Sequence, residues 1–124
     1  MILVDTSIWI DHLREGAPLL ENLLAKERVM AHPFVIGELA LGALRQREVF
    51  LQRVRELPSA LVASHDEVLT LILGRGLSGS GIGYVDAHLI ASVRMTPNAR
   101  LWTRDQKLAA VVERLGLLAD PHDA

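Results

Sequence analysis

The sequence opens with MILVDTS, residues 1–7, in which three apolar residues lead into an aspartate and two hydroxyl residues. A continuous apolar run such as Ile2–Val4 is typical of a strand that is buried on both faces of a sheet. Asp5 then stands at the carboxyl end of that strand, just before a helical pattern that begins near Ile8. Asp5 is therefore either a helix N-cap or a functional carboxylate, and this stretch alone leaves both explanations open.

Short apolar segments and helical patterns alternate along the rest of the chain. The further strand candidates are residues 28–31, 60–63, 99–103 and 117–118. Helices are expected over residues 8–16, 18–26, 33–44, 47–57, 64–74, 84–95 and 105–115. This alternation is typical of an α/β fold, in which a parallel sheet carries helices on its faces. In such sheets, functional residues gather at the carboxyl ends of the strands.

The composition narrows the class of protein. With 124 residues, half of them hydrophobic, the chain is expected to fold as one domain, residues 1–124, around one core. The absence of cysteine excludes disulfides, thiolate metal sites and cysteine nucleophiles, and it fits a reducing cytosol. We expect neither a secretory signal nor a membrane span, because the apolar runs are too short for either. The formal net charge of −2 does not by itself indicate nucleic-acid binding.

Three acidic residues stand in stretches that carry no other charge. Asp5 is the only charged residue among the first ten, Glu38 lies within FVIGELALG, and Asp86 lies within GIGYVDAHLIAS. A lone carboxylate on an apolar helix is costly to bury unless something pairs with it. Glu38 and Asp86 could each pair with an arginine. They could also converge with Asp5 and Asp105, at the ends of two predicted strands, around a cation.

We favour convergence, because its chemistry is self-consistent. Two carboxylates about 4 Å apart repel by roughly 4 kcal/mol at an effective dielectric near 20, so three or four together need a counter-charge. A divalent cation supplies that charge, and an all-oxygen ligand set suits Mg²⁺ or Mn²⁺ better than Zn²⁺. Such an ion can activate a water molecule and bind phosphate oxygens.

Taken in order, these motifs resemble the acidic tetrad of the PIN-domain ribonucleases, and more narrowly the VapC toxins of bacterial type II toxin–antitoxin systems. The resemblance rests on Asp5-Thr6-Ser7 after an opening strand, on Glu38 and Asp86 in the two segments quoted above, and on LWTRDQKL around residue 105. Each motif alone is modest, but the four in this order are specific. Together they cover essentially the whole chain.

The resemblance implies that Asp5, Glu38, Asp86 and Asp105 form a catalytic site. Asp5, Asp86 and Asp105 would be ligands of one or two Mg²⁺ or Mn²⁺ ions, while Glu38 would complete the site or orient the water. The activated water would attack an RNA phosphodiester in line, leaving a 5′-phosphate and a 3′-hydroxyl.

Three of the matching positions keep a second explanation. Thr6 and Thr103 match the family's hydroxyl positions, which support the acids or touch the substrate, but either could simply cap a helix. Asp105 lies between Arg104 and Lys107 and could cap the last helix in the same way.

The family also implies a fold and partners. The fold would be a three-layer α/β/α sandwich with a parallel sheet of four to five strands. The protein would be a cytoplasmic homodimer that cleaves RNA as a toxin, with no membrane association. A cognate antitoxin would block the site, and the complex would bind operator DNA only through the antitoxin.

Two other functions and one other motif offer alternatives to this hypothesis. A catalytically silent PIN-like module that binds antitoxin or RNA is the main alternative. A phosphotransfer protein is disfavoured, because Ser7 stands where a second acid would be needed. Residues 74–79, GRGLSG, match G-x-G-x-x-G, but no strand precedes them and no helix follows directly. We expect a loop there, either without a role or in contact with RNA.

Overall fold

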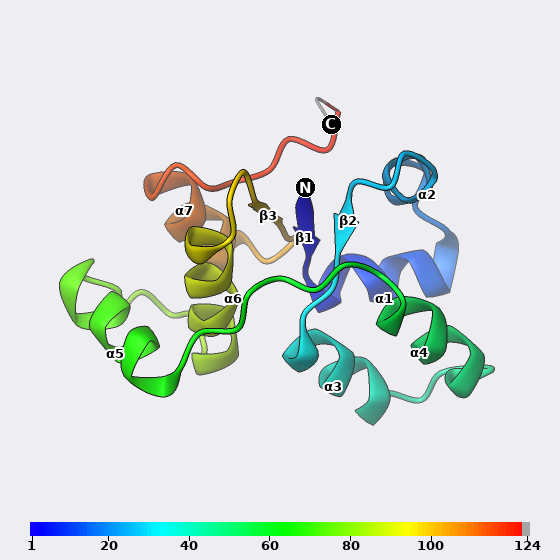
Figure 1. The fold of residues 1–124 in the computed structure, drawn as a ribbon, viewed down its shortest axis with the longest axis horizontal. Helices are drawn as coiled ribbons and strands as arrows, with labels where there is room; N and C mark the ends of the chain where they lie inside the picture. The colour runs from blue at the N-terminus through cyan, green and yellow to red at the C-terminus, as the bar shows by residue number, and fades with distance from the viewer. Residues whose placement is uncertain (123–124) are drawn as a thin grey trace.

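The computed structural model describes residues 1–122 and contains a three-stranded parallel sheet in the order β2-β1-β3 (Figure 1). The strands are β1 (Ile2–Val4), β2 (Val29–Met30) and β3 (Arg100–Trp102). All three residues of the central strand β1 are buried, as the opening apolar run predicts. The last two residues of the predicted 1–124 domain lie outside the described residues.

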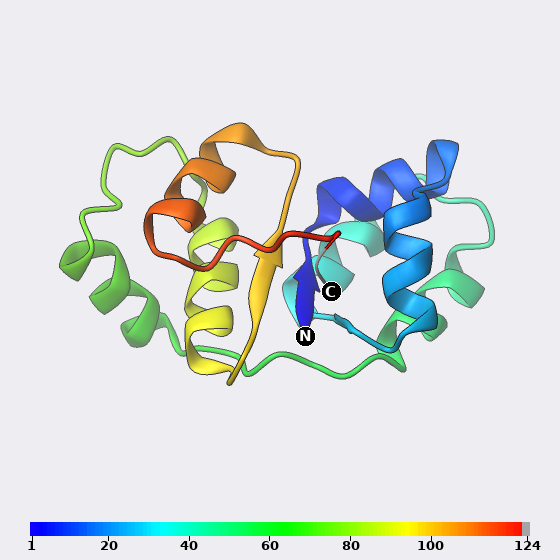
Figure 2. The same ribbon diagram turned by 90° about the horizontal axis from the view of Figure 1, so that it is seen from above.

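Seven helices connect and cover these strands within the described part of the chain. They are α1 (Thr6–Glu15), α2 (Pro18–Ala25), α3 (Pro33–Leu41), α4 (Arg47–Arg55), α5 (His65–Gly74), α6 (Tyr84–Met95) and α7 (Gln106–Arg114). In two perpendicular views, α5, α6 and α7 lie to one side of the sheet and α1 to α4 to the other (Figures 1 and 2). The α/β class predicted from the alternation is confirmed. Across residues 1–122, no helix combines the length and apolarity needed to cross a bilayer.

The sheet has fewer strands than the four or five predicted. Near the predicted strands 60–63 and 117–118 there is instead a single parallel bridge each. Ser59, just before the first segment, pairs with Ala31, and Leu118 pairs with Leu101. Near the first, Leu61 is 51% exposed and its N–H is bonded to the Thr96 hydroxyl, so its backbone does not extend the ladder. An apolar run that faces solvent cannot be distinguished from a buried strand by composition alone.

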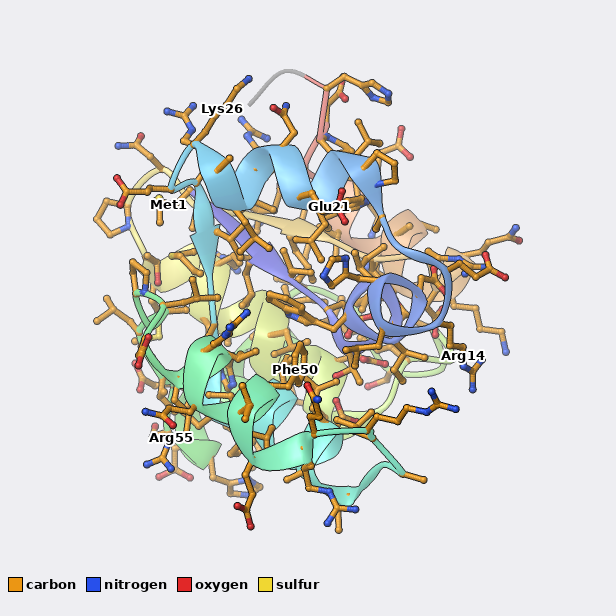
Figure 3. All side chains as sticks on the ribbon, turned by 90° about the vertical axis from the view of Figure 1, so that its right-hand side faces the viewer. Met1, Arg14, Glu21, Lys26, Phe50 and Arg55 are labelled. Atoms are coloured by element: carbon orange, nitrogen blue, oxygen red, sulfur yellow. The ribbon has the colours of Figure 1, made fainter. Side chains whose placement is uncertain are left out.

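The core lies between the sheet and the helices. Helix α6 is buried at seven consecutive positions from residue 87 to residue 93, because it contacts both β3 and α5. On the other side, Trp9 of α1 packs edge-on against Phe50 of α4, with ring centroids 5.8 Å apart. Phe50 points into the molecule, whereas Arg14 and Arg55 extend into solvent (Figure 3).

Because the strands are parallel, their carboxyl ends lie at one edge of the sheet. Asp5 follows β1 there, and its N–H donates to the Trp102 carbonyl at the end of β3 (3.0 Å). The first residue of α1 and the loop that enters α7 therefore start from adjacent points. This edge carries the candidate site.

One buried polar residue outside that site, His32, makes the stability of the fold depend on pH. His32 is fully buried at the N-terminus of α3, where its Nδ1 accepts a hydrogen bond from the Phe34 N–H (3.0 Å). The ring proton therefore sits on Nε2 and is donated to the Ser92 hydroxyl (2.9 Å). Burial, and secondarily the charge of His88, lowers the pKa of His32 to about 4. The folded state thus holds a neutral imidazole.

In the unfolded chain the His32 imidazole has its ordinary pKa of about 6.5, whereas in the folded protein its pKa is about 4. The stabilisation is therefore complete above pH 6.5 and is lost as the pH falls to 4. We expect a loss of about 3 kcal/mol in the free energy of unfolding over that range. Urea unfolding at several pH values would measure it. His32→Asn keeps a capping acceptor and should flatten this part of the profile, and parallel profiles for the two proteins would refute the prediction.

Candidate active site

The structure answers the question that Asp5 raises. Asp5 occupies the N-cap position of α1, but its side chain makes no capping hydrogen bond. Its carboxylate is buried, with the residue 7% exposed. Oδ2 accepts hydrogen bonds from the Thr103 hydroxyl (2.7 Å) and the Ser7 hydroxyl (2.8 Å). Asp5 is thus held in place at the sheet edge by hydroxyl groups, and helix capping does not explain it.

The hydroxyls of the two predicted threonines both donate to acidic side chains. Thr6 donates to Oε1 of Glu38 (2.7 Å), which joins the start of α1 to α3. Besides donating to Asp5, Thr103 accepts a hydrogen bond from the Asp105 N–H (3.0 Å). Each threonine therefore fixes an acid predicted to be functional.

Ser7 is a site residue that the sequence argument did not select. Its hydroxyl donates to Asp5 and accepts from the Arg104 N–H (3.1 Å), so it ties β1 to the loop that enters α7. The signal in the sequence was its place in the Asp5-Thr6-Ser7 triplet, which belongs to the motif that resembles the family but gave Ser7 no role of its own.

Asp86 lies in the first turn of α6, where its Oδ2 accepts a hydrogen bond from the Gly83 N–H (3.1 Å). Burial raises the pKa of the Asp86 carboxyl above its usual range, although the Gly83 hydrogen bond opposes this shift. Neighbouring negative charges raise it further, and they belong to Asp5, Asp105 and Glu38. The fold therefore brings the four predicted acids, from four separate segments, into one electrostatic neighbourhood.

Asp105 combines both of the explanations that the sequence left open. Its Oδ1 accepts hydrogen bonds from the N–H groups of Lys107 (2.9 Å) and Leu108 (3.1 Å), so it caps α7. At the same time its charge reaches Asp86. Capping does not remove Asp105 from the acidic neighbourhood.

Pairing with arginine, the structural alternative for Glu38 and Asp86, does not occur. Within residues 1–122, none of the four acids forms an ion pair. The basic side chain closest in sequence to Asp105, Arg104, is instead paired with Asp11. The site thus gathers negative charge without a basic side chain bonded to it.

The donor set suits a hard divalent cation, because it consists of carboxylate oxygens supported by hydroxyls. The side chains are too far apart to bind such an ion as they stand. In the part of the chain that the structure describes, no three acidic or histidine side chains are close enough to hold one. Three of the four acids are held apart by bonds to Thr6, to the Gly83 N–H and to the first turn of α7. Ligation would require these side chains to turn inward.

A hollow of about 570 Å³ lies elsewhere, between α5 and α6, and none of the four acids lines it. The acidic neighbourhood is a feature of the sheet edge and not of this hollow. The chemistry of this acidic site depends on its carboxylates and on the hydroxyl groups that donate hydrogen bonds to them.

Comparison with known proteins agrees with the motifs. A family model described as the PIN domain matches residues 2–114, which include all four acids. The chain is 49% identical over 117 residues to "Ribonuclease VapC32" of Mycobacterium tuberculosis, in strains CDC 1551 / Oshkosh and ATCC 25618 / H37Rv. Each alignment covers 94% of both proteins. The chain therefore belongs to the PIN-domain family, in its VapC branch.

Proposed function

We propose that this protein is a Mg²⁺- or Mn²⁺-dependent endoribonuclease that acts as the toxin of a type II toxin–antitoxin pair. The observation that carries the proposal is the raised pKa of the Asp86 carboxyl, which is caused by burial and by three other carboxylates. An acid whose pKa is raised by burial together with neighbouring charges is a candidate for a functional site. The relatives named as ribonucleases supply the class of reaction.

In this proposal Asp5, Asp86 and Asp105 hold the ion. The bound cation would offset the carboxylate charge, polarise a phosphate oxygen and lower the pKa of a water molecule. Asp5 is the most buried of the three, and the hydroxyls of Thr103 and Ser7 both donate to its Oδ2.

Glu38 acts on the attacking water. Thr6 holds Oε1, and the residue is exposed, so the second oxygen is free to orient the water and accept its proton. As the water oxygen bonds to phosphorus, the P–O3′ bond breaks and the 3′ oxygen takes a proton from solvent. The products are a 5′-phosphate and a 3′-hydroxyl.

The partners follow from the family. We infer a homodimer, an antitoxin that covers the acids, and operator DNA bound only through the antitoxin, all in the cytoplasm where the RNA is. We also assign residues 1–124 to one three-layer α/β/α domain. The parallel bridges at Ser59 and Leu118 support this assignment, because they would be remnants of a fourth and a fifth strand.

Cleavage of total cellular RNA by the purified, antitoxin-free protein tests the proposal. We expect discrete fragments with 5′-phosphate ends in Mn²⁺ or Mg²⁺ and none in excess chelator. The alternative, a silent PIN-like module, predicts RNA or antitoxin binding without turnover. An absence of fragments from metal-supplied protein would therefore favour that alternative.

A further inference from the structure

The loop between α5 and α6, which contains the unexplained G-x-G-x-x-G match, makes a specific contact with α7. Three of its glycines have left-handed backbone conformations: Gly76 (φ +64°), Gly79 (φ +74°) and Gly81 (φ +88°). At Gly81 the space that a side chain would fill is occupied by Lys107. A Cβ there would lie 2.9 Å from Lys107 Cδ and 3.5 Å from Nζ, whereas one at Gly79 or Gly76 would meet nothing within 4 Å. The Lys107 side chain thus crosses the backbone of Gly81.

This contact joins two segments that carry site acids. Gly81 is two residues before Gly83, whose N–H holds Asp86. The Lys107 N–H is held by Asp105 at the start of α7. In Figure 2 the end of the loop lies beside the first part of α7. Lys107 therefore starts from the same first turn of α7 that Asp105 caps, and its side chain packs against the loop segment that leads to Asp86.

The Lys107 ammonium has no acidic side chain paired with it in the described part of the chain. Within residues 1–122 Lys107 is exposed and forms no ion pair, although four acids lie in the neighbourhood of its helix start. Arg104, in contrast, is already neutralised by Asp11. A free ammonium beside a site that must accept a polyanion favours a phosphate contact, since lysine binds phosphate as a point charge.

We propose that Lys107, held in place across Gly81, binds a backbone phosphate of the RNA adjacent to the one that is cleaved. This inference rests on the proposed function, because it takes RNA as the substrate of the same site. Lys107 touches substrate, and Gly81 is a positioning residue that acts through it. A different role, in which Lys107 only offsets the charge of the acids, would alter turnover and metal dependence but not the binding of RNA.

The first experiment measures RNA binding and its salt dependence. In an Asp86→Asn background with Mg²⁺, the affinity for a labelled single-stranded RNA is measured by fluorescence anisotropy between 50 and 200 mM salt. We expect Lys107→Ala to weaken binding roughly 3- to 10-fold at low salt and to reduce the slope of log K against log salt by about 0.7, the value for one single-strand phosphate contact. Lys107→Arg should restore both.

Lys26→Ala is the matched control for net charge. Lys26 follows α2 just before β2, at the amino end of the sheet and thus opposite the acidic edge (Figure 3). This variant should bind RNA as tightly as its parent. In the protein with Asp86 intact, Lys107→Ala should raise KM by a similar factor and leave kcat within about twofold.

Gly81→Ala and Gly79→Ala form a second matched pair. Both place a side chain at positive φ and share that backbone cost. Only Gly81→Ala displaces Lys107, so it alone should reproduce the loss of RNA affinity, and it should add little once Lys107→Ala is present. If Gly81→Ala does not fold, the lysine variants still decide the question.

The outcomes separate the two proposals. RNA cleavage by the wild type, together with unchanged affinity and salt slope in Lys107→Ala, would overturn the role of Lys107 and leave the nuclease standing. An equal loss in Lys26→Ala would overturn it as well, because net charge would then be sufficient. Lys107-dependent RNA binding without any cleavage would support Lys107 and overturn the nuclease.

Discussion

Replacing Asp86 with asparagine should reduce RNA cleavage by roughly 100-fold or more while raising the melting temperature of the metal-free protein. The activity is expected to fall because asparagine keeps the shape and an acceptor for the Gly83 N–H but lacks the charge that would hold a cation. The stability is expected to rise because three neighbouring carboxylates and burial disfavour a negative charge at this position. One substitution therefore moves activity and stability in opposite directions.

The pH dependence of this gain has a definite sign. The pKa of Asp86 is raised in the folded state, so the folded protein binds this proton more readily than the unfolded chain. The destabilisation by Asp86 is therefore fully present at neutral pH and disappears as the pH falls below the usual range of an aspartate. Thermal unfolding in chelator should show a gain for Asp86→Asn at pH 7 and almost none near pH 3. A lower melting temperature at pH 7 would show that the carboxylate is structural.

Asp11→Asn is a suitable control for this experiment. Asp11 also lies on a helix near the site, but it is paired with Arg104 and is not one of the charges that act on Asp86. Its neutralisation should leave cleavage nearly unchanged. A comparable loss of cleavage in both variants would mean that general acidity, and not the four converging acids, supports the reaction.

The sequence predicted what depends on local pattern. The run Ile2–Val4 had to be a buried strand because nothing polar interrupts it, and it is the central strand. The isolation of Asp5, Glu38 and Asp86 predicted that they meet around a cation, because an apolar segment gives a carboxylate no local partner. The charges of Asp5 and Glu38 do act on Asp86, but no three acidic or histidine side chains among residues 1–122 are close enough to hold an ion. The helix expected over residues 64–74 is α5, which begins with a capping box formed by Ser64 and Glu67.

What the sequence did not predict depends on contacts between distant segments. The strand expected over residues 60–63 does not form: the Leu61 N–H bonds to the hydroxyl of Thr96, which is far away along the chain, and not to a neighbouring strand. Ser7 was missed because its second partner, the Arg104 N–H, is far away along the chain. The sequence also did not predict that Lys107 packs on Gly81, because a glycine in a loop does not indicate which distant side chain will contact it.

The second large effect should appear when metal is added to the wild-type protein. Among residues 1–122 the acids are not close enough to chelate an ion as they stand, and hydrogen bonds to neighbouring groups hold three of them in these positions. An ion that binds only the folded state would stabilise it by about 2.7 kcal/mol at 100 times its Kd. For a chain of 124 residues this corresponds to a rise of roughly 10 °C in Tm.

Calorimetry with increasing Mn²⁺ or Mg²⁺ would measure this rise, and chelator should reverse it. The response separates a metal site from a merely acidic surface, because nonspecific screening by a monovalent salt of equal ionic strength would not reproduce it. Asp86→Asn should start from a higher Tm and respond weakly, whereas Lys107→Ala should respond as the wild type does, since it removes no ligand. A wild-type Tm that stays constant across the titration would mean that the four acids do not bind an ion. Asp86 would then owe its raised pKa to crowding alone.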